Sequence, residues 1–206
     1  MIKSRQRVKD LGEVFTADRE VNAMLDLVKG ESYRIDSRFL EPSCGTGNFI
    51  VKIIERKMTV VNRSSISYEH CIFNTLVAVS SVYGVDICPD NVKETKMRVK
   101  SIILENFKVT SRYFRAALNY ILDHNIILGD MLNGRDAINF IEYKTPKIMH
   151  DYEISTSDDK SSYIDPSLFR FRLVEFNVND LDTPLRTSRL VSMRGIPHAL
   201  ERAGRH

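Results

Sequence analysis

The chain has 206 residues, of which 43% are hydrophobic and 28% are charged, and its formal net charge is +3. This size and composition predict one soluble globular domain with a proper core, and the lack of any long apolar run excludes a membrane-spanning helix. The small positive charge permits a nucleic-acid partner without indicating one, because such surfaces normally need clustered basic residues.

The cysteines and the N-terminus indicate the compartment. Cys44, Cys71 and Cys88 do not have the spacing of metal ligands. The basic residues between positions 3 and 9 are not followed by the apolar core of a signal peptide. We therefore expect reduced thiols in a cytoplasmic protein, with no bound metal and no membrane partner.

The N-terminal region predicts a basic lead followed by a helix. Residues 1–10 fit either a solvated tail or an arm that contacts phosphates. The sequence Leu-Gly-Glu-Val-Phe-Thr-Ala follows at residues 11–17. Apolar residues then recur at helical spacing up to Val28, where Thr16 or Asp18 can cap the helix and Gly30 can end it.

Residues 38–58 predict a strand, a glycine turn and a helix, and the sequence at 40–49 is Leu-Glu-Pro-Ser-Cys-Gly-Thr-Gly-Asn-Phe. Gly45 and Gly47 allow a sharp turn and let a ligand approach the backbone without a Cβ in the way. The helix begins with unpaired N–H groups that face such a ligand. Glu41 ends the strand, at the edge where ligands bind in open α/β sheets.

A second strand is predicted at residues 81–87. Before it, residues 62–65 have the composition of a turn, and apolar residues between 68 and 79 indicate another helix. Asp86 lies at the end of the strand, where a carboxylate can accept hydrogen bonds from both hydroxyls of a ribose. Alternatively, Asp86 caps the helix that begins near Pro89.

Two more helices and a third strand are predicted over residues 90–130. The helices span 90–107 and about 111–123, and the Lys and Glu residues of the first indicate a solvated face. The strand is Asn-Ile-Ile-Leu-Gly-Asp at 125–130. Asp130 in this position is also typical of a simple turn-former.

The pattern weakens after Gly134. Residues 135–142 predict a short helix, 144–166 a polar loop, and the alternation at 169–176 a half-buried strand. The last thirty residues hold five arginines and little apolar material, which is typical of a tail that is loosely packed or bound to something. We divide the chain into an α/β domain at 1–143 and an extension at 144–206.

Four of these segments resemble motifs of class I S-adenosylmethionine-dependent DNA methyltransferases, in particular those of restriction–modification or phage systems that methylate the exocyclic amine of adenine. Residues 40–49 resemble the cofactor motif of that family, and residues 12–16 its N-terminal motif, with Ala17 where the family has proline. Residues 83–87 and 125–130 resemble its second and third motifs. The resemblance covers residues 11–133.

The resemblance implies a Rossmann-like class I methyltransferase fold, which is α/β with a mainly parallel sheet and helices on both faces. It also implies S-adenosylmethionine as cofactor, with Thr16 near the methionine end, Asp86 at the ribose, and Asp130 or its neighbours at the adenine ring. The residues implied in cofactor binding are Phe15, Thr16, Glu41, Pro42, Ser43, Cys44, Gly45, Gly47, Asn48, Phe49, Asp86, Ile87, Asp130 and Met131.

The catalytic tetrapeptide of that family, (Asn/Asp)-Pro-Pro-(Tyr/Phe), does not occur in this sequence. In the family its acceptors hold the target amine and its ring stacks on a flipped base. The nearest match is Asp165-Pro166, which is followed by Ser167-Leu168, and Asp-Pro is common in plain turns. Catalytic residues are therefore left unassigned.

Three functions agree with these observations, and DNA is the partner that the resemblance implies. The chain is either a short adenine methyltransferase or a cofactor-binding module without its own catalytic loop. Such a module is either completed by a second protein subunit or acts as a degenerate regulatory or DNA-binding protein. Methylation of a small molecule or a protein uses the same fold, which does not determine the substrate.

Overall fold

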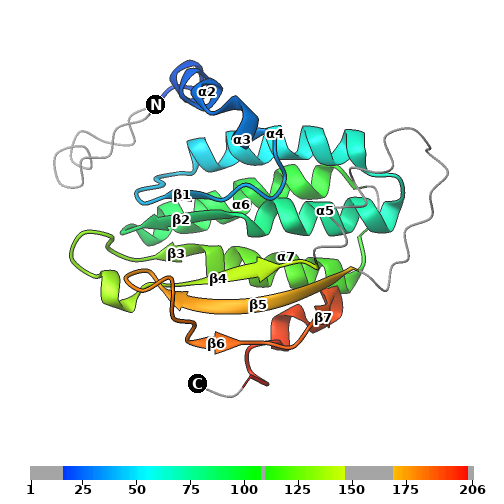
Figure 1. Cartoon of the computed structure of the whole chain (residues 1–206). Coiled ribbons are helices and arrows are strands. Elements are labelled where there is room, and N and C mark those ends of the chain that lie inside the picture. Colours follow the sequence, from blue (N-terminus) through cyan, green and yellow to red (C-terminus); the bar gives the residue numbers. More distant parts are fainter. Residues whose placement is uncertain (1–15, 108–109, 147–168, 204–206) are drawn as a thin grey trace.

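The computed structural model describes residues 16–107, 110–146 and 169–203 (Figure 1). Its first part contains α2 (Asp18–Leu27), α3 (Lys29–Ser32), β1 (Phe39–Glu41), α4 (Asn48–Ser64), α5 (Tyr68–Ser80), β2 (Val82–Asp86), α6 (Pro89–Glu105), α7 (Arg112–Asn125) and β3 (Ile126–Leu128). Its second part contains η1 (Arg135–Ala137), β4 (Asn139–Lys144), β5 (Arg170–Asn177), β6 (Arg186–Thr187), β7 (Val191–Ser192) and η3 (Met193–His198). The α/β class predicted from the sequence is confirmed.

The first three strands form a parallel sheet in the order β1-β2-β3. Phe39 pairs with Val82 and Asp86 with Leu128, so the first two predicted strands are adjacent and parallel, as expected. Helices α5 and α7 lead almost directly into β2 and β3, while α4 and α6 return the chain after β1 and β2 (Figure 1). The arrangement is compatible with a Rossmann-like fold, although the sheet is small, with three strands in the part of the chain that the structure describes.

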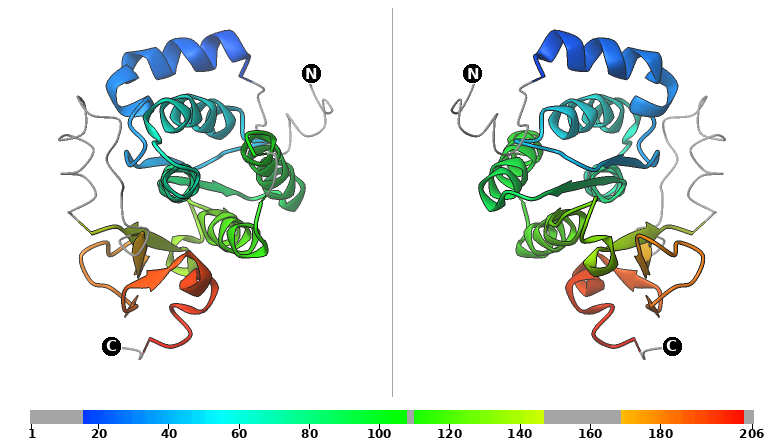
Figure 2. Two further views of the ribbon diagram at one scale, coloured as in Figure 1. Left: turned by 90° about the vertical axis from the view of Figure 1, so that its right-hand side faces the viewer. Right: turned by 90° about the vertical axis from the view of Figure 1, so that its left-hand side faces the viewer.

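The two faces of β2 are covered differently. A Cβ on Gly84 would lie 2.5 Å from Ile50 of α4, so this face of the strand abuts a helix. Tyr83 and Val85 point to the opposite face, where they pack in a cluster with Ile138, Phe140 and Val178. Figure 2 shows the second group of strands on one side of the molecule and α6 on the other. The expectation of helices on both faces is therefore wrong for β2.

The second sheet is antiparallel, unlike the mainly parallel sheet that we expected. β5 pairs with β4 along six residues and with the short strands β6 and β7. The strand β5 was predicted, but β4 replaces the second half of the short helix expected at 135–142, of which η1 keeps the start. The apolar residues at 140 and 141 are compatible with a helix or a strand, and hydrogen-bonded pairing with β5 stabilises the strand. This pairing joins the predicted ranges 1–143 and 144–206.

The C-terminal region is folded against the helices, which corrects the prediction of a loosely packed tail. η3 packs on α7. Ile196, Ala199 and Leu200 are buried in the main core, whereas Leu181, Leu185 and Leu190 are exposed. A segment with few apolar residues can thus pack well when three of them near its end are buried together.

Three helix boundaries also differ from the prediction. Helix α4 continues through residues 62–64, where we expected a turn. Ala17 is the N-cap residue of α2 and makes no side-chain cap, so neither Thr16 nor Asp18 has that role. Gly30 lies within α3 instead of ending the preceding helix. No helix in the described part of the chain is long and apolar enough to cross a bilayer.

A buried lysine forms hydrogen bonds with the segments that lead into β1 and β2 and so connects the amino ends of these strands. Lys57 of α4 is completely buried. Its Nζ donates hydrogen bonds to the carbonyl oxygens of Ile35 (3.1 Å) and Ser37 (2.5 Å) and to Ser81 Oγ (2.6 Å). All three donors of the ammonium group are therefore satisfied. Burial lowers the pKa of Lys57 to about 7, and the charge of Asp36 opposes this only in part.

Candidate functional site

The loop at residues 42–47 joins β1 to α4 at the carboxyl edge of the parallel sheet. Cys44 N–H donates to the Val85 carbonyl (2.9 Å), and Gly47 N–H donates to the Cys44 carbonyl (2.8 Å). Gly45 and Gly47 have φ angles of 53° and 83°, which are the positive φ values found among the described residues. The left-handed conformation favours glycine at both positions.

Asp86 at the end of β2 holds this loop. Its side chain is buried, and Oδ2 accepts the Gly45 N–H at 2.8 Å. Oδ1 accepts the Cys88 N–H at 2.9 Å and the Asn91 side-chain amide at 3.2 Å. The N-cap residue of α6 is Cys88 and the helix has no side-chain cap, so Asp86 holds the residue before the helix and does not cap the helix itself. A carboxylate has about four acceptor positions, so one remains for a further donor.

The two glycines of the loop have different surroundings. No heavy atom lies within 4 Å of a Cβ built on Gly45, so the backbone there faces open space. A Cβ on Gly47 would lie 2.6 Å from the Thr95 side chain of α6. Gly47 is therefore required for the packing of the loop on α6, and only Gly45 leaves room for a ligand next to the backbone.

This difference predicts unequal effects of the two alanine substitutions. Gly47→Ala is expected to lower the free energy of unfolding by about 2–3 kcal/mol, because the new methyl group collides with Thr95 and the φ angle is strained. Gly45→Ala should cost about 1 kcal/mol, from φ alone. Urea unfolding of both variants tests this, and equal losses would contradict the proposed role of Thr95.

Asn48 and Arg98 connect the loop to the N-terminal motif and to α6. Asn48 Nδ2 donates to the Thr16 carbonyl at 3.1 Å. Arg98 Nη1 donates to the Asn48 side-chain oxygen (2.9 Å) and the Thr46 carbonyl (2.6 Å). Thr16 thus lies beside the glycine loop, while Phe15 lies outside the described residues. Sequence reasoning missed Arg98 and Thr95, because nothing distinguishes them from the other polar residues of α6.

Two ionisable groups of the loop have shifted pKa values. Burial raises the pKa of Glu41, and the Ser43 backbone N–H partly opposes the shift. Burial and then the nearby charge of Asp86 raise the pKa of the Cys44 thiol to about 12. The Cys44 thiol is therefore protonated at neutral pH and is a poor nucleophile. Pro42 and Ser43 are exposed at the tip of the loop.

Asp130 follows β3 and forms a turn. Its carboxylate accepts the backbone N–H groups of Leu132 (2.8 Å) and Asn133 (3.0 Å) and the Asn133 side-chain amide (3.0 Å). These bonds lower the pKa of Asp130, with the Asn133 backbone bond as the largest cause. Gly129 N–H donates to the Asp86 carbonyl at 3.0 Å, which holds the start of the turn at the same edge.

The apolar residues implied in the site divide into one exposed and two packed side chains. Ile87 is half exposed beside Asp86. Phe49 packs against the main core and Met131 against the cluster around Tyr83 and Val85. The structure thus gathers Glu41, Gly45, Asp86 and Ile87 at one edge, with Asp130 in the next turn, whereas Phe49 and Met131 serve packing.

The fold and the loop define an α/β protein with a left-handed glycine turn at the carboxyl edge of its parallel strands. A scan against protein-family models finds no match, and searches of curated proteins and of solved structures also find none. The candidate acceptor pair Asp165-Pro166 lies outside the described residues.

Proposed function

We propose that the chain binds S-adenosylmethionine at the glycine loop and is a DNA methyltransferase-like protein related to adenine-N6 methylases. The observation that supports this most is the convergence of Glu41, Gly45 and Asp86 at the carboxyl edge of the parallel strands. Nucleosides bind at this edge in open α/β sheets. The motif resemblance of residues 40–49 adds the choice of cofactor.

The residues present fit such a cofactor in three respects. Open space beside Gly45 lets a ligand approach the backbone, and Asp86 keeps an acceptor position for a ribose hydroxyl. Glu41 is partly exposed and can accept from the amino group of the methionine moiety. The bound cofactor would supply the methyl group, and this chain's residues would hold and orient it.

A catalytically incomplete module is the second candidate, and one observation favours it. Among the described residues, β1 has a strand neighbour on one side only, and the chain after β3 enters an antiparallel sheet. No strand in the described ranges therefore presents acceptors for an adenine amine beside the glycine loop. The acceptors would then come from residues outside the described ranges or from a second polypeptide.

Cofactor binding is tested with Gly45→Asp and titration calorimetry. Aspartate tolerates a left-handed φ, so the variant should fold, and its carboxylate would occupy the open space beside the loop. We expect binding of S-adenosylmethionine to weaken at least tenfold. Gly30→Asp is the matched control, because the space around Gly30 is also open and α3 is remote from the loop. No binding by the unaltered protein would refute the assignment.

Methyl transfer by the isolated chain is expected to be weak or absent even where the cofactor binds. An adenine amine is a poor nucleophile, and a misplacement of 1 Å in its acceptors can reduce the rate about a hundredfold. Tritiated methyl transfer to mixed-sequence DNA measures this directly. Robust transfer that Asp165→Ala leaves unchanged would show that the acceptors lie elsewhere in the chain.

A further inference from the structure

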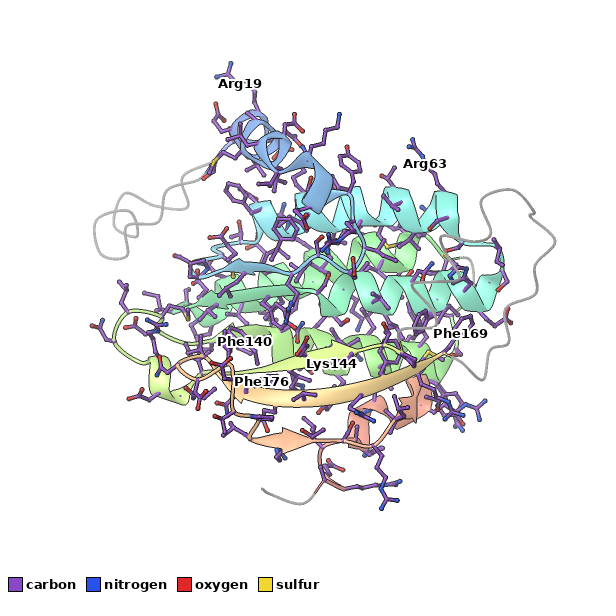
Figure 3. The ribbon with its side chains drawn as sticks, viewed as in Figure 1. Arg19, Arg63, Phe140, Lys144, Phe169 and Phe176 are labelled. Atoms are coloured by element: carbon purple, nitrogen blue, oxygen red, sulfur yellow. The ribbon has the colours of Figure 1, made fainter. Side chains whose placement is uncertain are left out.

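Two arginines from distant parts of the chain stack on one tyrosine. The Cζ atoms of Arg112 and Arg194 lie 4.8 and 4.3 Å from the centroid of the Tyr113 ring. Arg112 Nη2 also donates to the Tyr113 hydroxyl at 2.8 Å. Arg112 and Tyr113 begin α7, and Arg194 comes from η3, which packs on that helix. Figure 3 shows nitrogen-tipped side chains gathered beside η3.

The positive charges of these arginines are not neutralised by carboxylates of the described residues. Among the described residues, no ion pair involves Arg112, Arg115 or Arg194.

The charges also oppose one another and the helix. Two guanidinium groups that each lie within 5 Å of one ring centroid lie within about 10 Å of each other, so they repel. The first turn of α7 holds Arg112 and Arg115 and no acidic residue, although the helix dipole disfavours cations there. A polyanion that binds these arginines would relieve both unfavourable interactions, the repulsion between the guanidinium groups and the opposition of the helix dipole.

We propose that this surface, formed by Arg112, Tyr113, Arg115 and Arg194 and called here the arginine surface, binds the phosphate backbone of duplex DNA. Guanidinium forks match phosphate oxygens in pairs, and stacking on tyrosine holds their planes in place before binding. Duplex DNA presents about one negative charge per 1.7 Å, so both stacked arginines meet phosphates at once. The choice of DNA rests on the proposed function.

The position of the surface makes it an anchor. α7 has fourteen residues, a length of about 21 Å, and its C-terminal end leads into the amino end of β3. The arginine surface at the start of α7 therefore lies on the amino-edge side of the parallel sheet, away from the carboxyl edge that holds the glycine loop (Figure 1). Contacts there fix the protein on the duplex without reading its sequence. Binding through this surface should therefore be independent of DNA sequence and strongly dependent on salt.

The test is fluorescence anisotropy of the full chain with a labelled mixed-sequence duplex at several salt concentrations. The double variant Arg112→Gln with Arg194→Gln removes two phosphate contacts. Its plot of log affinity against log salt should be shallower than that of the unaltered protein by about 1.8, with at least a tenfold loss of affinity at low salt. The control is Arg19→Gln with Arg63→Gln, two exposed arginines on α2 and α4 (Figure 3), which should leave both quantities unchanged.

Three outcomes would overturn the proposal: no salt-dependent DNA binding by the unaltered protein, equal losses in the two double variants, or displacement of DNA by polyglutamate at equal charge concentration. Circular dichroism shows whether each variant is folded. Tyr113→Ala removes the ring but no charge, so it should weaken DNA binding with little change in the salt slope. Calorimetry with S-adenosylmethionine is a separate test of the proposed function. The DNA measurements can be interpreted even if the cofactor does not bind, so the failure of one proposal is distinguishable from the failure of the other.

Discussion

Replacing Asp86 by Asn is expected to lower the free energy of unfolding by about 3 kcal/mol. The substitution keeps the shape of the side chain but removes its charge and turns one acceptor oxygen into a donor. One side of the carboxylate accepts Gly45 N–H and the other accepts Cys88 N–H and the Asn91 amide, so an NH2 group on either side faces a donor. Each charge-assisted bond contributes about 1.5–3 kcal/mol, and buried donors without a partner add to the loss.

Urea unfolding at pH 7 measures the effect. Asp90→Asn is the control, because Asp90 is exposed in the first turn of the same helix and should lose well under 1 kcal/mol, from the helix dipole alone. If the two variants are equally stable, Asp86 does not hold the loop and the helix start together. Cofactor affinity of the Asp86 variant is informative only at temperatures where circular dichroism shows it folded.

Replacing Lys57 by Met is expected to abolish a large part of the dependence of stability on pH. Burial lowers the pKa of Lys57 to about 7 in the folded protein, whereas an unfolded lysine has a pKa of about 10.4. Between these values the unfolded chain holds a proton that the folded chain has released. Stability therefore rises with pH across this window, by up to about 1.4 kcal/mol per unit, and the rise is absent below pH 7.

Denaturant unfolding at pH 7 and pH 9 isolates this contribution. The stability of the unaltered protein minus that of Lys57→Met should increase by about 2–3 kcal/mol between the two pH values. Lys52→Met on the same helix is the control: its hydrogen bond with Glu55 raises the pKa of Lys52, so it does not titrate in this window. A constant difference for Lys57→Met would mean that the lysine stays charged through its three hydrogen bonds.

The glycine loop is the part of the site that local sequence predicts best. The positive φ angles of Gly45 and Gly47 favour glycine at both positions, which is a property of the backbone at those residues. Asp86 could be placed at the end of a strand, but its two possible roles could not be separated in advance. Its bond to the Gly45 N–H crosses between β1 and β2, and only their pairing brings the two groups to 2.8 Å.

Residues that act through contacts from other elements could not be found in the sequence. Thr95 and Arg98 matter because α6 places them on the glycine loop. Lys57 looks like any surface lysine of an amphipathic helix, yet it is buried among three acceptors. The stack of Arg112 and Arg194 on Tyr113 exists only because η3 folds onto α7.

The sequence by itself determined the alternation of helices and strands up to β3, because apolar periodicity and glycine conformation are local properties of the chain. The tertiary structure alone decided that residues 139–144 form a strand, that one face of β2 is covered by a second sheet, and that the C-terminal residues are folded. Each of these depends on a partner far away in the sequence. A short apolar segment adopts the conformation in which a distant partner satisfies the segment's backbone hydrogen bonds and covers the segment's side chains.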